Sequence, residues 1–108
     1  MATPKVMIDN KKTKVTLWSF EPGEDTGSHI HEHDYVIVPI TDGELKIINS
    51  DGTITFTKLN KGISYFKEKG VEHNVINNNN YAFSFVEIEF KRNGERFNDS
   101  YSFNDKIY

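Results

Sequence analysis

Three of the four histidines in this chain lie close together at alternate positions: His29, His31 and His33. In an extended strand, alternate side chains point to the same face, so His29 and His31 can direct two imidazole nitrogens at one point. Neutral imidazole nitrogens are common ligands of divalent transition metals. The segment therefore predicts part of a metal-binding site on a strand.

The remaining histidine, His73, lies in a separate segment and follows a glycine at Gly70. The chain contains no cysteine, which excludes disulfides and thiolate ligands and leaves histidine, carboxylate and water as possible ligands. We therefore expect His29, His31 and His73 to hold one divalent metal ion. Iron, zinc, nickel, copper and manganese all remain candidates.

The elements that must position these side chains are expected to be short strands. β-branched and aromatic residues recur without a helical period, and no helix longer than a turn or two is indicated. Glycine-containing turns separate the segments at short intervals, as in β-sandwiches and barrels. We therefore predict an all-β fold. The expected strands cover residues 13–20, 35–40, 44–49, 53–59, 63–66 and 81–91, with a further strand around His73.

Two Asp-Gly pairs, at Asp42-Gly43 and Asp51-Gly52, both indicate hairpin turns, because glycine adopts a positive φ without steric cost. In the last strand, strict alternation places Phe83, Phe85, Glu87 and Glu89 on one face. Carboxylates in such a pattern usually face solvent, but Glu87 could instead orient a ligand histidine.

The composition narrows the classes of partner. The length of 108 residues and the 13% aromatic share are enough for one domain with a core. The net charge of −3, with both signs mixed along the chain, argues against nucleic acid. No apolar run has the length of a membrane span, and residues 1–14 lack the pattern of a signal peptide. We expect a cytoplasmic protein that binds a small molecule, and neither nucleic acid nor a membrane.

The domain organisation is expected to be simple. Residues 1–12 would form an N-terminal edge segment, 13–91 the barrel, and 92–108 a polar C-terminal segment that still carries aromatic residues. A barrel of this size leaves exposed sheet edges, and aromatic side chains in the C-terminal segment could dock on a second copy. We therefore predict a homodimer, the commonest soluble oligomer.

The two histidine segments resemble the two sequence motifs of the cupin superfamily. In the first motif, Gly23, His29, His31 and Gly43 fall at the family's spacing. The positions that match the second motif are Gly62, Gly70, His73 and Asn77, with Glu68 standing where the family has proline. The resemblance covers roughly residues 18–91. It implies a small double-stranded β-helix, or jelly-roll barrel, of the cupin type.

One departure from the family pattern concerns the metal ligands. The family's glutamate would fall at Val36 or Tyr35, and neither is a carboxylate. A site with three nitrogens remains, to which His33 could add a fourth ligand or Glu87 an orienting contact; the sequence leaves both open. Tyr35 is a further candidate for the pocket.

A substrate carboxylate would need a positive partner within the pocket, and Lys46 or Lys67 could supply it if either points inward.

The patterns His-x-His-x-His-Asp-Tyr-Val, from His29, and Gly-Val-Glu-His-Asn-Val, from Gly70, also resemble very small bacterial cupins associated with β-alanine degradation. This resemblance implies a setting in small-molecule catabolism. Together with the three-nitrogen site, it leads us to expect a metal-dependent enzyme with an oxygenase-type reaction on a small organic or amino acid. Two alternatives are a non-catalytic cupin that binds a metabolite and a cupin whose metal is purely structural. Three protein ligands leave a coordination position open, which favours the enzyme.

Overall fold

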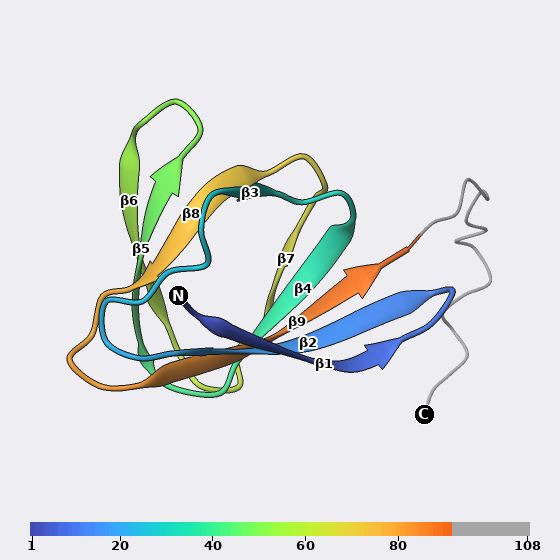
Figure 1. Ribbon diagram of the computed structural model, residues 1–108, viewed down its shortest axis with the longest axis horizontal. Coiled ribbons are helices and arrows are strands. Elements are labelled where there is room, and N and C mark those ends of the chain that lie inside the picture. The colour runs from blue at the N-terminus through green and yellow to red at the C-terminus, as the bar shows by residue number, and fades with distance from the viewer. Residues whose placement is uncertain (92–108) are drawn as a thin grey trace.

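The computed structural model describes residues 1–91, which form nine β-strands and no helix (Figure 1). The all-β prediction is therefore confirmed for this part of the chain. The strands are β1 (Thr3–Asp9), β2 (Thr13–Phe20), β3 (His29–Ile30), β4 (Asp34–Pro39), β5 (Gly43–Asn49), β6 (Ile54–Leu59), β7 (Tyr65–Lys67), β8 (Glu72–Asn77) and β9 (Phe83–Phe90).

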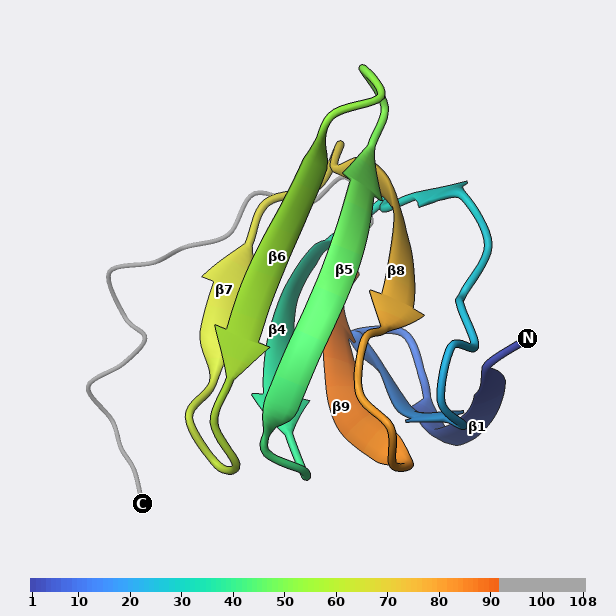
Figure 2. The ribbon, with the colours of Figure 1, turned by 90° about the vertical axis from the view of Figure 1, so that its left-hand side faces the viewer.

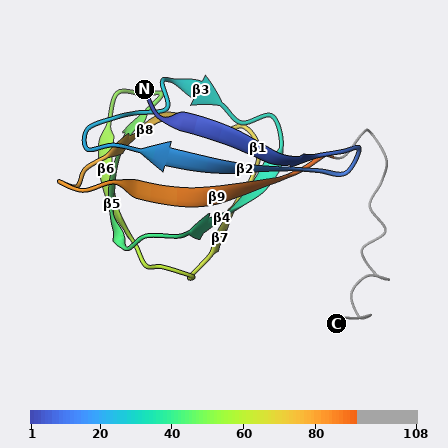
Figure 3. The ribbon, with the colours of Figure 1, turned by 60° about the horizontal axis from the view of Figure 1, so that its bottom comes forward.

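The strands form two sheets that face each other. The larger sheet has the order β1-β2-β9-β4-β7, which Figure 3 shows from its outer side. The smaller sheet has the order β3-β8-β5-β6, and Figure 2 shows β6, β5 and β8 side by side. All pairings are antiparallel. Consecutive strands often lie in different sheets, so segments far apart in sequence meet inside the barrel.

The interior changes from apolar to polar along β9, whose alternate residues share one face as predicted and point inward. Phe83 is fully buried and packs with Phe85 and Phe20 in an aromatic cluster. Glu87 and Glu89 follow on the same face and line an internal cavity. One end of the barrel is therefore closed by apolar packing, and the other end is polar and open.

The Asp-Gly prediction is right at one site and wrong at the other. Gly52 has a φ of 87° in the turn of the β5–β6 hairpin. Asp42-Gly43, however, joins β4 in one sheet to β5 in the other, so it forms no hairpin. Gly43 is needed for space rather than for φ, because a Cβ there would lie 2.8 Å from the Asn79 amide nitrogen and from the Phe83 ring.

The N-terminal strand β1 lies at the edge of the larger sheet and pairs only with β2. The predicted C-terminal segment, 92–108, lies outside the described residues, and the homodimer stays a prediction. Within residues 1–91, no helix is long and apolar enough to cross a membrane.

Candidate metal centre

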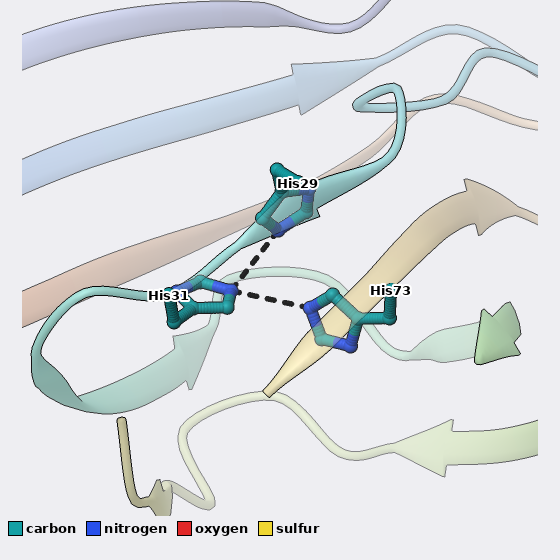
Figure 4. A group of neighbouring side chains, drawn as sticks. All are labelled: His29, His31 and His73. Carbon is teal, nitrogen blue, oxygen red and sulfur yellow. Dashed lines mark hydrogen bonds between the residues drawn. The ribbon is translucent and has the colours of Figure 1, made fainter. Parts of the chain in front are cut away.

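Three histidine side chains converge at the open end of the barrel (Figure 4). His29 on β3 lies directly opposite His73 on β8 in the antiparallel register. His31 follows β3 immediately, and its Nε2 lies 3.0 Å from Nε2 of His29 and 3.1 Å from Nε2 of His73. Strand β3 is only two residues long, yet the alternate positions still send both side chains to the same side, as expected.

The backbone around His31 is tied to the segment that precedes β8. The His31 N–H donates to the Val71 carbonyl at 2.8 Å, and its own carbonyl accepts from the Gly70 N–H at 2.8 Å. Gly70 adopts a φ of 99°, a conformation that other residues rarely adopt. These two bonds hold His31 beside His73 although the two residues are 42 positions apart.

The contacts of the Nδ1 atoms indicate which ring nitrogens are free to coordinate. Nδ1 of His29 lies 2.9 Å from the Gly27 carbonyl, which can only accept, so we assign the proton of the neutral ring to Nδ1. Nδ1 of His31 lies 3.5 Å from Oε2 of Glu87, which favours the same assignment. In both rings the lone pair then lies on Nε2 and points into the cluster.

Two of the three rings carry no positive charge at neutral pH. Burial and the neighbouring His29 and His73 lower the pKa of His31 to about 3. Burial, His29 and the Lys67 ammonium lower the pKa of His73 to about 4. His31 and His73 are therefore uncharged at neutral pH, and Nε2 of His31 lies 3.0–3.1 Å from Nε2 of both neighbours. A ring proton can bridge only one pair of these nitrogens, whereas a metal ion could bind all three.

The spacing of the nitrogens fits a divalent metal. An ion about 2.1 Å from two nitrogens that lie 3.0–3.1 Å apart sees them at an angle of about 90–95°, whereas a tetrahedral angle needs a separation of about 3.4 Å. Both separations are closer to that of adjacent octahedral ligands than to that of tetrahedral ligands. The three histidines, within 4.8 Å of one another, form the group among residues 1–91 that could hold a metal.

Glu87 lies behind His31, in the orienting position that the sequence left open. Its side chain is buried, with Oε1 accepting a hydrogen bond from the Trp18 indole at 3.2 Å. Burial, reinforced by Glu89, raises the pKa of Glu87 to about 7, although the Trp18 bond and Lys14 oppose the rise. Glu87 thus faces the ring of a ligand histidine and does not join the cluster itself.

Tyr35 stands near the position where the cupin pattern has its glutamate, and it contacts the cluster through its ring. The ring stacks on His31 with centroids 3.9 Å apart and planes 16° apart. Burial and the neighbouring Tyr65 and Glu87 raise the pKa of Tyr35 well above its ordinary value. Burial and Glu87 likewise raise the pKa of Tyr65 to about 12. Both phenols therefore stay neutral and can donate hydrogen bonds.

The histidine cluster lines an internal cavity of about 560 Å³, a volume that accommodates a small molecule. The apolar part of the wall comes from both sheets. The charged and phenolic side chains of the wall are Lys14, Tyr35, Tyr65, Lys67, Glu87 and Glu89.

Two of the residues predicted for the site lie elsewhere. His33 lies in the bend before β4 and is neither in the cluster nor in the cavity wall, so it is no fourth ligand here. Lys46 points to the outer face of β5, because Leu45 and Ile47 on either side of it point inward. Lys67 is the one of the two candidate lysines that lines the cavity.

Four residues of the cavity wall that matter for the site were missed by the sequence. Lys14, Trp18 and Tyr65 had been given no site role, and Glu89 was expected on a solvated face. The alternation of β9 carried a usable signal, because Glu87 and Glu89 share a face with two buried phenylalanines.

Residues 16–89 match the family model of the cupin domain, and the chain belongs to the cupin family. The β-alanine degradation protein BauB of Pseudomonas aeruginosa is 48% identical over 90 residues, which are 83% of this chain and 94% of BauB. A cupin domain from Bordetella pertussis has a TM-score of 0.81 and 49% identity, over 84% of this chain and 94% of that one.

A more distant solved structure extends the likeness in fold. A Klebsiella pneumoniae protein with a double-stranded β-helix domain has a TM-score of 0.71 and 24% identity, over 87% of this chain and 80% of that one. The predicted double-stranded β-helix of the cupin type is therefore confirmed.

Proposed function

We propose that this cupin is a metal-dependent enzyme that acts on a small organic or amino acid. The observation that carries the proposal is the convergence of three imidazole Nε2 atoms, that of His31 lying 3.0–3.1 Å from the other two, at the wall of a cavity large enough for a metabolite. A purely structural metal centre need not adjoin a cavity, whereas substrate must be able to reach a catalytic centre.

His29, His31 and His73 would hold the ion, and we propose that it is iron(II). The nitrogen spacing is closer to an octahedral face than to the tetrahedral arrangement typical of structural zinc. Iron(II) held by these residues would supply oxygen-activating redox chemistry.

The chain's own residues would orient the centre and keep it dry. Glu87 holds the His31 ring by its Nδ1 edge, and Trp18 holds Glu87 in turn. Tyr35 covers one face of His31 and limits the access of water. The neutral hydroxyls of Tyr35 and Tyr65 can donate hydrogen bonds to a bound ligand. The name of the BauB relative supports a catabolic setting and suggests β-alanine among the first compounds to try.

The test begins with protein purified without a metal-affinity tag and analysed for its metal content. Metal-free protein is then loaded anaerobically with iron(II), mixed with candidate amino and thiol acids including β-alanine, and monitored for oxygen uptake and product. Turnover that requires both iron and one compound supports the proposal. The matched control is the His73→Ala protein, which should show neither metal retention nor turnover.

Two outcomes contradict the proposal and point to the alternatives. Tight binding of a compound without turnover with any metal would indicate a metabolite-binding module. Stoichiometric zinc that no compound perturbs, and whose removal unfolds the protein, would indicate a structural metal.

A further inference from the structure

Four polar side chains form a straight row across the inner face of the larger sheet, next to the histidine cluster. On β2 and β9, Lys14 lies directly opposite Glu89. On β9 and β4, Glu89 lies opposite Tyr35, and on β4 and β7, Tyr35 lies opposite Lys67. All four line the cavity. We call this set (Lys14, Glu89, Tyr35 and Lys67) the ionic row.

The ionic row passes directly beneath the histidines. Its central member, Tyr35, stacks on His31. Lys67, on one side of Tyr35, lies near enough to His73 for its ammonium to lower the pKa of that ring. Glu89, on the other side, lies near enough to Glu87 to raise the pKa of that carboxyl. A positive group and a negative group therefore flank the ring that covers the metal centre.

The charges of the ionic row are not used by the fold. Within residues 1–91, neither Lys67 nor Glu89 takes part in an ion pair or a side-chain hydrogen bond, and Lys14 forms no ion pair with its neighbour Glu89. Charged groups at the wall of a cavity are costly unless they are paired or solvated. Lys67 is exposed at the rim of the cavity and is therefore solvated, whereas Lys14 and Glu89 are half-buried. The half-buried Lys91 at the end of the same sheet, by contrast, donates to Asp9 and to the Asn10 carbonyl.

The spacing of the two opposite charges limits the size of a matching ligand. Residues two strands apart have Cα atoms about 10 Å from each other, since adjacent strands are about 4.8 Å apart. Charge-assisted hydrogen bonds of about 2.8 Å at each end leave room for a short molecule between the side chains. A carboxylate and an ammonium separated by two or three carbons would fit this gap above Tyr35.

We propose that the ionic row selects a short ω-amino acid, with its carboxylate paired to Lys67 and its ammonium paired to Glu89. The inference rests on the proposed function, since it names the substrate class of the same site. It adds a prediction that the metal centre alone does not make. The ligand must carry both charges, and each charge must pair with a different residue.

The test uses three matched probes: β-alanine, which carries both charges, propionate, which lacks the amine, and propylamine, which lacks the carboxylate. Binding is followed by the fluorescence of Trp18, the single tryptophan, which itself lines the cavity. Zinc-loaded and metal-free protein are both titrated, so binding is measured without reference to turnover. The variants are Lys67→Met and Glu89→Gln, with Lys46→Met and Glu72→Gln on the outer face of the smaller sheet as controls.

We expect β-alanine to bind more tightly than either partial probe. Lys67→Met should weaken β-alanine and propionate about tenfold and leave propylamine unchanged, because one charge-assisted bond is lost. Glu89→Gln should weaken β-alanine and propylamine similarly and leave propionate unchanged. Both control variants should match the wild type.

The inference is overturned if β-alanine binds no better than propionate, if the two variants affect all probes equally, or if no probe binds. These outcomes are separate from a failure of the proposed function. Protein that holds no metal but shows the charge-specific pattern would keep the inference and reject the enzyme. Iron-dependent turnover of an uncharged compound would keep the enzyme and reject the inference.

Discussion

Strand β8 carries a polar cluster at each end, and the two clusters differ in how their hydrogen bonds are satisfied. At its C-terminal end, the Asn77 amide nitrogen donates to the carbonyls of Phe20 and Tyr81, and its oxygen accepts two hydrogen bonds from Asn79. Asn79 in turn bonds both backbone groups of Glu44. Every strong donor and acceptor of this asparagine cluster has a partner within the protein.

The histidine cluster at the other end of β8 is organised in the opposite way. The outward Nδ1 edges of His29 and His31 face protein acceptors, while the Nε2 atoms of all three rings face one another. The side chains of Asn77 and Asn79 are satisfied within the protein, whereas the three histidines present converging nitrogens that could hold a metal ion. Buried polar side chains therefore do not by themselves mark a functional site. Polar atoms that converge on one point, as the three Nε2 atoms do, are a better indication.

The largest expected effect comes from breaking the histidine cluster. His73→Ala removes a ligand, and it should lower metal affinity by more than about a hundredfold, since even partners that merely orient a ligand contribute about 10–100-fold. Elemental analysis of untagged protein measures the loss. The metal-free variant should unfold within about 1 kcal/mol of the metal-free wild type, because no satisfied bond is removed.

His33→Ala is the matched control, because His33 lies outside the cluster; it should retain its metal. Full metal occupancy in the His73→Ala protein would contradict the metal-centre assignment.

Breaking the asparagine cluster should have the reverse consequence. Asn77→Ala leaves two carbonyls and an asparagine without their partners in a site where Asn77 is only 2% exposed. We expect a loss of about 2–4 kcal/mol in the free energy of unfolding, and a fall of about 10 °C or more in Tm. Urea denaturation of the metal-free protein measures the change. Asn80→Ala, in the exposed turn, should cost less than about 0.5 kcal/mol.

The folded fraction of Asn77→Ala should still bind metal with the affinity of the wild type. A variant that is as stable as the wild type but has lost its metal would show that the two ends of β8 cannot be separated as we describe.

A substitution at Glu87 tests whether orienting the His31 ring increases the affinity for metal. Glu87→Gln keeps the shape of the side chain but offers a single acceptor oxygen, so it cannot face His31 and accept from Trp18 with two oxygens as the carboxylate does. Zinc affinity, measured by competition with a chelator, should fall about 10–100-fold. Trp18→Phe removes only the bond to the far oxygen, and its effect should be smaller. A larger loss in Trp18→Phe would contradict the orienting role.

The smallest effect on stability is expected at the exposed ion pair between Lys91 and Asp9, which belongs to neither cluster. The hydrogen bond from Lys91 lowers the pKa of Asp9 below its ordinary value of 3.8. A carboxyl whose pKa is lower in the folded state adds stability above the unfolded pKa and loses it as pH falls through the folded pKa. Asp9→Asn should therefore be slightly less stable than the wild type at pH 7 and equal to it near pH 2, by thermal melts in matched buffers. A constant difference at all pH values would contradict this.

Local patterns in the sequence were enough for most of the fold. The predicted strand 13–20 coincides with β2, and the alternation of β9 is as expected. The histidines were recognised because His29 and His31 are close in sequence and His73 shares a family motif. These signals lie within short windows, where strand periodicity operates.

The errors concern relations between strands. Asp42-Gly43 has the local chemistry of a hairpin, but the chain crosses between sheets there. Lys46 and Lys67 are indistinguishable in sequence, because only the packing of the two sheets decides which face of each strand looks inward. The ionic row could not be seen at all, since its four residues come from four strands and meet only through register.

The two backbone bonds of His31 reach Val71 and Gly70 in the segment before β8, and His73, 42 positions from His31, follows directly after that segment. An ion shared by His31 and His73 would fasten the same junction, and for a loop of that length cross-linking restricts the unfolded chain by about 3–4 kcal/mol. In a chain without cysteine, a bound metal would thus cross-link the fold as a disulfide does, and thiol reductants would not break the cross-link. Metal-bound protein would then resist proteolysis at the short edge strand β3 for longer than metal-free protein, whether or not a substrate is present.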